Sequence, residues 1–232
     1  MLFFTIIVTV KNDGSITNYM KRLNEEEILS VKNDLVSSKS AKRRSAAKKI
    51  GKYQIISMKD ELLEAYVKER QDVRTWETQA VMITALGKVD HKAALPYLQE
   101  IIDQNKTFDA ITCFAALAYI RLTRKNANDM ETVIDFMTIG DASVFDGAVM
   151  ALAYDDIVPT ESEMKKVIEI LNARKTVYDR PYSNPIAMLI SAMYKWPQEI
   201  SLPFLTQYQH ATEYAHLVAN TLSGKRSYTD MS

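Results

Sequence analysis

The stretch SAKRRSAAKKIGK, Ser40 to Lys52, points most directly to the fold. It carries six cations and no acid, so it could either bind phosphate or serve a structural purpose. At helical spacing Ala46, Ala47 and Ile50 share one stripe with Arg43, and the other cations flank that stripe. The pattern predicts an amphipathic helix that packs its small residues inward and turns its lysines toward water.

The bulk composition is that of an ordinary globular protein, with 232 residues, 47% of them hydrophobic and 25% charged. Lys plus Arg and Asp plus Glu both number 29, so the chain lacks the basic excess typical of nucleic-acid-binding proteins. The single cysteine, Cys113, cannot form an internal disulfide, which predicts a reducing, cytoplasmic environment. Its apolar neighbours predict a small buried hydrophobe rather than a nucleophile.

The first ten residues, MLFFTIIVTV, are apolar and rich in β-branched side chains. They are too few for a membrane-spanning helix, which needs about 20 residues, and they lack the flanks of a signal peptide. We expect residues 1–19 to form an N-terminal arm with strand character. It packs on the domain formed by residues 20–232, makes a dimer contact, or is an upstream extension of that domain.

Beyond Val10 the apolar residues recur at helical spacing and strand alternation is not sustained, which predicts an all-α protein. One segment, LGKVDHKAALPYLQEI at Leu86–Ile101, returns as MYKWPQEISLPFLTQY at Met193–Tyr208. Pro96 and Pro203 occupy equivalent positions in the two copies. Because the first turn of a helix tolerates proline, both are expected to lie in a first turn.

Weaker copies keep the same phase along the chain. Gly51 and Gly87 lie 36 positions apart, and Ala85, Ala118 and Ala151 follow one another at intervals of 33. The two glycines are expected to end helices. Units of this length, each a helix, a turn and a helix, bury their apolar stripes only by stacking. The sequence therefore predicts about five stacked helix pairs in a single domain.

The segments KRRSAAKKIG, ALG and ALPYL resemble the HEAT repeat in the short form found in bacterial HEAT-like proteins. Arg43 stands where that family has an arginine that ties neighbouring units together, and Gln79 stands at this position in the next unit. The resemblance covers roughly residues 24–225. It implies an armadillo-like α-α superhelix, or α-solenoid, that acts as a non-enzymatic scaffold for a protein partner.

In HEAT-like arrays the second helix of each pair lines the concave face. We expect second helices at 58–69, 91–103, 128–139, 161–173 and 199–208, which carry thirteen acids against five bases. This predicts an acidic concave face suited to a basic or neutral protein surface, although acids early in a helix also favour its dipole. The acids expected to contact the partner are Glu61, Glu64, Glu100, Asp103, Asp135 and Glu169.

The connection KTVYDRPYSNP, residues 175–185, interrupts the repeat. Tyr178, Arg180 and Tyr182 are of residue types that are enriched at binding hot spots. The segment is therefore either a recognition loop or a spacer between units.

The alternative function is nucleic-acid binding through the basic first helix, in the manner of alkylpurine DNA glycosylases, which share the HEAT-like build. Those enzymes need an aromatic cradle on a basic concave face, whereas Trp76 and Trp196 are expected to pack. The three histidines lack metal-binding spacing, so no metal, cofactor or catalytic residue is expected. The cations that would contact nucleic acid are Lys42, Arg44, Lys48, Lys49 and Lys52.

Overall fold

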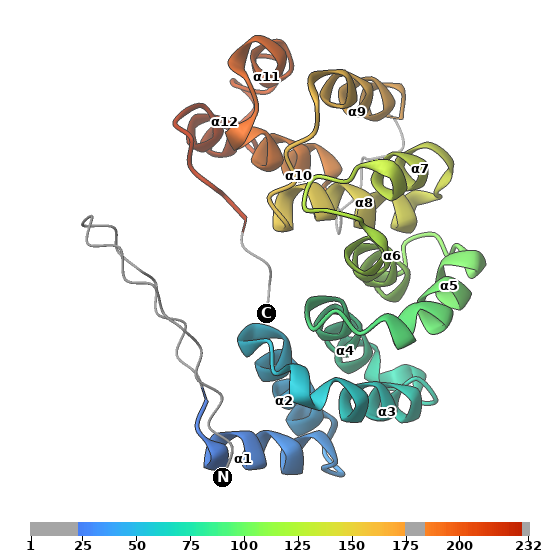
Figure 1. The fold of residues 1–232 in the computed structure, drawn as a ribbon. Coiled ribbons are helices and arrows are strands. Elements are labelled where there is room, and N and C mark those ends of the chain that lie inside the picture. Colours follow the sequence, from blue (N-terminus) through green and yellow to red (C-terminus); the bar gives the residue numbers. More distant parts are fainter. Residues whose placement is uncertain (1–22, 175–183, 229–232) are drawn as a thin grey trace.

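The computed structural model describes residues 23–174 and 184–228 (Figure 1). All regular structure in these ranges is helical, which confirms the all-α class. The arm expected at residues 1–19 lies outside the described residues. The α-helices are α1 (Glu25–Leu35), α2 (Ser40–Tyr53), α3 (Lys59–Glu69), α4 (Trp76–Lys88), α5 (Leu95–Gln104), α6 (Ala110–Thr123), α7 (Glu131–Ile139), α8 (Ala142–Tyr154), α9 (Glu161–Ala173), α10 (Pro185–Ala192), α11 (Gln198–Leu205) and α12 (Ala215–Leu222).

The helices form two rows along an arc (Figure 1). The even-numbered helices, α2 to α12, pack side by side in chain order and form the inner row. The odd-numbered helices α3 to α11 lie on the outer side of the arc. From α1 to α8, each odd-numbered helix packs extensively on the even-numbered helix that follows it. From α1 to α8 a structural pair is therefore an outer helix followed by an inner helix.

Small residues let the inner helices approach closely. A Cβ atom added to Gly51 would lie 3.2 Å from the Cα atom of Ala85, and one added to Gly87 would lie 3.0 Å from that of Ala118. Ala85, Ala118 and Ala151, the three alanines in phase, are all buried on successive inner helices. The interval read from the sequence thus matches the step from one inner helix to the next.

The two glycines do not end their helices, contrary to the prediction. Gly51 lies inside the last turn of α2, which runs on to Tyr53 and ends at Gln54 in the left-handed conformation, with φ of 47°. Gly87 likewise precedes the last residue of α4. Close approach to the next inner helix, rather than a turn, is what favours a residue without a side chain at these positions.

Pro96 lies in the first turn of α5, as predicted. Pro203 lies inside α11, so the prediction for this residue is wrong. The reason is that α11 already begins at Gln198, whereas the corresponding residues before α5 form a separate 3₁₀ turn, Lys92–Ala94.

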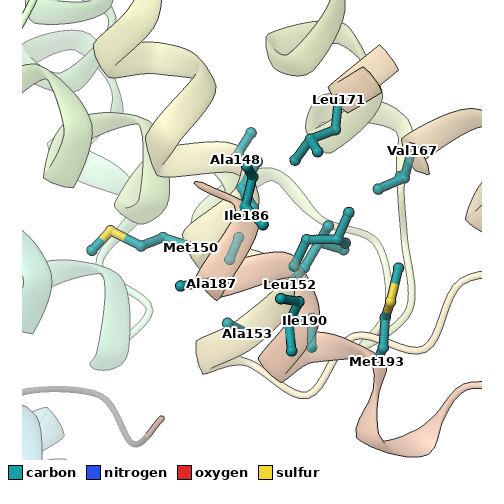
Figure 2. Packing of buried hydrophobic residues seen from close by; sticks show 14 of the residues in the cluster. Ala148, Met150, Leu152, Ala153, Val167, Leu171, Ile186, Ala187, Ile190 and Met193 are labelled. Carbon is teal, nitrogen blue, oxygen red and sulfur yellow. The ribbon is translucent and has the colours of Figure 1, made fainter. Parts of the chain in front are cut away.

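Two buried clusters of apolar side chains fill the space between the rows. Figure 2 shows a portion of the C-terminal cluster, which includes Ala148 and Leu152 of α8, Leu171 of α9, and Ile186 and Ile190 of α10. Full burial of one large aliphatic side chain stabilises the fold by about 1.5–3 kcal/mol. These helices therefore depend on one another for their stability.

Arg43 joins three segments of the first units, as the resemblance implied. Its guanidinium donates hydrogen bonds to the carbonyl of Ser37, at 2.7 Å, and to the carboxylate of Glu69, where Nη2 lies 2.8 Å from Oε1. Gln79 has a comparable role in the next unit, since its amide donates to the carbonyl of Asp72 at 2.8 Å. Both side chains thus provide hydrogen bonds to acceptor groups in loops or at helix ends beside the outer row.

The pKa of Glu69 reflects two opposing influences. Burial of its side chain favours the neutral acid and is the largest single influence. Hydrogen bonds from Arg43, Thr75 and Ser40 favour the carboxylate, and together they hold the pKa below its ordinary value. Glu69 is therefore ionised in the native protein at neutral pH.

Candidate functional site

The acids predicted for the concave face lie on the outer row. Glu61 and Glu64 belong to α3, Glu100 and Asp103 to α5, Asp135 to α7 and Glu169 to α9, and all of these helices are on the outer side of the arc (Figure 1). The prediction that they line the inner surface was wrong because it counted the helix at 58–69, α3, as the partner of the helix before it, α2. In the structure α2 packs on α1, and α3 packs on α4. The inner surface is formed by the alanine-rich helices instead.

Several of these acids have local partners. Glu61 binds Lys32 of α1 at 3.0 Å, Glu100 binds Arg70 at 2.8 Å, and Asp103 accepts a hydrogen bond from Gln99. The bond to Lys32 is the main reason that the pKa of Glu61 is lowered. Exposed pairs of this kind add little to stability. Glu64, Asp135 and Glu169 are exposed. Binding of a partner by this acidic row stays a prediction.

The predicted recognition loop with Tyr178, Arg180 and Tyr182 lies outside the described residues. Both interpretations of this segment, a recognition loop and a spacer, therefore stay predictions.

The basic helix α2 orients its residues as predicted. Ala46, Ala47 and Ile50 are buried, and Lys48 and Lys52 are exposed.

The cations of α2 differ in their surroundings. Lys42 pairs with Asp34 at 3.3 Å, Arg44 pairs with Glu77 of α4, and the Lys52 ammonium lies 5.6 Å from the ring centre of Tyr53. Two of the five candidate nucleic-acid contacts are thus already neutralised by a nearby carboxylate.

An open groove of about 400 Å³ lies on the inner row, between α2, α4 and α6. Trp76 and Val81 of α4 and Phe114 of α6 contribute its large apolar side chains. Trp76 is 49% exposed, so the expectation that it packs does not hold for about half of this residue's surface. Trp196, in contrast, is 5% exposed and does pack. An exposed tryptophan beside an apolar hollow is a common feature of binding surfaces.

Small residues create the floor of this groove. Ala47 and Gly51 of α2 lie beside Ala80 and Ala85 of α4, and the groove lies above these small residues. Thr84 also lines the groove, but its hydroxyl donates to the carbonyl of Ala80 at 2.9 Å within its own helix. The same close approach that packs the inner helices therefore leaves a shallow apolar surface above their contact.

Charged side chains surround this floor. Arg44 and Lys48 come from α2, whereas Glu77 and Lys88 come from α4. Arg44 and Glu77 neutralise each other near the N-terminus of α4. Lys88 lies near its C-terminus, where its Cδ atom would be 3.4 Å from a Cβ atom on Gly51. The charged lining therefore consists of three cations and one acid, two of which, Arg44 and Glu77, pair with each other.

The sequence contained a signal for this groove that composition alone did not reveal. Trp76, Ala80 and Thr84 recur at intervals of four on α4, and Arg44 and Lys48 do so on α2. Each of these two sets of residues lies on one face of its helix. The sequence does not show that the two faces are adjacent, because this depends on α2 and α4 being neighbours in the inner row.

The described residues contain no group of three or more His, Cys, Asp or Glu side chains placed to hold a metal ion. Cys113 is packed beside Met150, with the two sulfur atoms 3.5 Å apart, and burial raises the pKa of its thiol strongly. Burial also lowers the pKa of His91, near Asp60. Neither side chain is thus poised as a nucleophile or cation at neutral pH.

None of the helices within 23–174 and 184–228 has the length and apolar character needed to cross a membrane. No family model matches the chain, and no curated protein or solved structure shows significant similarity to it.

Proposed function

We propose that the protein is a HEAT-like helical repeat that works as a non-enzymatic, cytoplasmic binding protein and takes a protein partner on its inner row. The observation that carries this proposal is the groove between α2, α4 and α6 with the half-exposed Trp76. Tryptophan and arginine are the residue types that most often dominate binding energy at protein interfaces. Trp76 and Arg44 lie together at one end of this groove.

The fold supports the same function. Two rows of helices in chain order, with alanines at a constant interval, are typical of arrays that present one extended surface to a partner. The groove is open and shallow, and it is lined by more apolar than charged side chains. Those properties suit a protruding side chain of a partner protein.

Nucleic-acid binding through α2 is the second candidate. Lys48, Lys49 and Lys52 follow one another on a helix that contains no acid. Against this candidate, the whole chain has no net positive charge, and Lys42 and Arg44 are paired with carboxylates. A phosphate-binding surface would gain affinity from each unpaired cation and would lose it in salt.

Capture from a nuclease-treated extract of the source cell, followed by mass spectrometry, tests the first candidate. Proteins held by the wild type are expected to be lost with Trp76→Ala. They are expected to be retained by Phe108→Ala, which removes an exposed aromatic ring that does not line the groove. Equal capture by Trp76→Ala would contradict the proposed surface. Loss of capture with Glu64→Lys or Glu169→Lys would favour the outer row instead.

A gel-shift assay of the wild type with duplex and single-stranded DNA, at about 50 and 200 mM salt, tests the second candidate. A shift at low salt that disappears with Lys48→Ala and Lys52→Ala would support it. No shift at low salt would end it.

A further inference from the structure

The groove between α2, α4 and α6 offers an apolar surface that the described residues leave partly open. Trp76 is 49% exposed beside it, and Val81 and Phe114 are half-buried on its sides. On the rim, Arg44 and Glu77 form an ion pair with each other. An occupant of this groove gains free energy mainly by covering apolar side chains, and an uncharged occupant leaves that ion pair intact.

The segment Met1–Val10, which lies outside the described residues, has a composition that matches this surface. Eight of its ten residues are hydrophobic, the other two are threonines, and none is charged. Burial of one phenylalanine side chain stabilises a protein by about 1.5–3 kcal/mol relative to its exposure to water. At about 400 Å³ the groove is at the lower end of the range of roughly 300–1,000 Å³ found for ligand pockets. It therefore suits a few apolar side chains, such as those of Phe3 and Phe4.

The length of the connection places this segment within reach of the groove. Residues 11–22 link it to Leu23, the first described residue, and these twelve residues span up to about 40 Å. Leu23 packs against the same buried cluster that contains Ala47 and Ala85 of the groove floor. The groove begins on α2, which packs on α1, and these two helices are about 21 and 16 Å long. The connection is therefore long enough to span this packed pair.

We propose that the segment Met1–Val10 binds in the groove of its own chain, where Phe3 or Phe4 packs on Trp76. This inference rests on the protein-binding function proposed above, because it makes the segment an intramolecular competitor of the partner. Segment and partner cover the same apolar floor and cannot occupy it together. The segment thereby regulates access to the groove, since it has to leave before a partner binds.

Attachment to the same chain favours this occupant over a second copy of the protein. A short flexible linker holds a tethered group at an effective concentration in the millimolar range, far above the concentration of most free proteins. Binding within one chain is therefore favoured over exchange between two chains. The apparent affinity for a partner falls in proportion to the fraction of molecules with an open groove, and we expect a reduction of about fivefold.

Photocrosslinking of the full chain locates the segment directly. The photoreactive residue p-benzoyl-phenylalanine replaces Phe4, and mass spectrometry identifies the crosslinked peptides. We expect crosslinks to groove residues of α4 or α6, in molecules of monomer mass. The same replacement at Ile139, which is 80% exposed on α7 and does not line the groove, is the control. Crosslinks from Phe4 only outside the groove, only between two chains, or none at all would overturn the inference.

Tryptophan fluorescence measures the cover that the segment provides. The chain has two tryptophans and Trp196 is buried, so acrylamide quenches mainly the fluorescence of Trp76. A chain with both Phe3→Asp and Phe4→Asp is expected to be quenched about twofold more strongly, because the apolar floor does not accommodate charged side chains. The matched control adds the same charge to the connection, with Ser15→Asp and Asn18→Asp, and should be quenched like the wild type. Equal quenching of all three chains would overturn the inference.

Capture of the cellular partner separates this inference from the function on which it rests. The chain with Phe3→Asp and Phe4→Asp is expected to hold the partner about fivefold more tightly than the wild type, and equal capture would contradict the competition. If Trp76→Ala loses the partner but Phe4 crosslinks outside the groove, the protein-binding function stands and the inference is wrong. If Phe4 crosslinks within the groove but Trp76→Ala leaves capture unchanged, the site of the segment stands and the protein-binding function of the groove fails.

Discussion

Helices α4 and α8 occupy comparable positions in the inner row but differ greatly in their exposure. Helix α4 presents Trp76, Glu77, Val81 and Lys88 to the groove. Helix α8, two steps further along, buries all thirteen of its residues. Both helices are flanked by two inner neighbours and one outer helix. Position in the array therefore does not by itself decide which region of the inner row stays open.

The two helices differ in composition. The sequence of α4, WETQAVMITALGK, has charged residues near both ends, whereas that of α8, ASVFDGAVMALAY, has Asp146 as its only charged residue. The chain beyond α12 also returns to this region, where the Arg226 guanidinium donates to the carbonyl of Tyr154 at 2.6 Å. The comparison teaches that α4 leaves aromatic and charged side chains exposed on the inner row, whereas α8 uses every residue for packing.

The largest expected difference between the two halves of the array is the loss of stability when the tryptophan of each half, Trp76 or Trp196, is replaced by alanine. Trp196→Ala is expected to lower the free energy of unfolding by about 3–5 kcal/mol, because it empties a buried site. Trp76→Ala is expected to lower it by about 1 kcal/mol or less, since half of that side chain is already in water. Urea denaturation followed by circular dichroism measures both. Equal losses would show that the two halves do not differ in this way.

The next effect concerns Asp155, the residue that follows α8. Its carboxylate binds Arg121 at 2.6 Å and Arg124 at 3.0 Å, and the Arg121 side chain is buried. Asp155→Ala is expected to cost about 3 kcal/mol of stability, because it leaves a buried guanidinium without its carboxylate. The matched control, Glu131→Ala, removes the exposed partner of Lys125 and should change the unfolding midpoint far less.

Glycine substitutions give a smaller effect that also separates the halves. In Gly147→Ala the new Cβ atom would lie 2.4 Å from the carbonyl oxygen of Cys113, so α6 and α8 must separate. The higher helix propensity of alanine offsets this cost by about 1 kcal/mol, so we expect a net decrease of about 2 kcal/mol in the free energy of unfolding. In Gly51→Ala the new Cβ atom would lie 3.2 Å from Ala85, and the strain of this contact should nearly cancel the gain in helix propensity. Thermal unfolding of the two variants side by side tests the difference.

The smallest effect is the acid sensitivity of the first half. The pKa of Glu69 is lower in the folded protein than in the unfolded chain, so its carboxylate stabilises the fold at neutral pH. That contribution is lost as the pH falls through the folded pKa. Unfolding measured from pH 7 to pH 3 should show a shallower acid decline for Glu69→Gln than for wild type. Glu64→Gln, at an exposed position, should retain the wild-type slope.

Much of the fold was available from the sequence. Helical spacing placed the helices, and the recurrence of Ala85, Ala118 and Ala151 established the repeat length. The inward stripe of Ala46, Ala47 and Ile50 was also read correctly, because local periodicity alone determines which face of a helix is apolar.

The side of the arc on which each helix lies could not be read in the same way. A sequence that alternates helices looks the same whether a pair is counted from α1 or from α2. What decides the pairing is distance, since Gly51, Gly87 and their alanine partners bring the even-numbered helices closest together. Because of that error of phase, the acidic helices were predicted on the concave side although they lie in the outer row, and the groove beside Trp76 was not predicted.

The short contacts of the inner row have a mechanical consequence. Residues with almost no side chain, such as Gly87 against Ala118 and Gly147 against Ala116, fix the spacing of that row at the backbone itself. Contacts between outer helices are few by comparison. If the arc were to bend, we would therefore expect the inner row to keep its length and the spacing between the outer helices to change. In that case a partner bound as proposed on the inner row would meet a surface of nearly constant length.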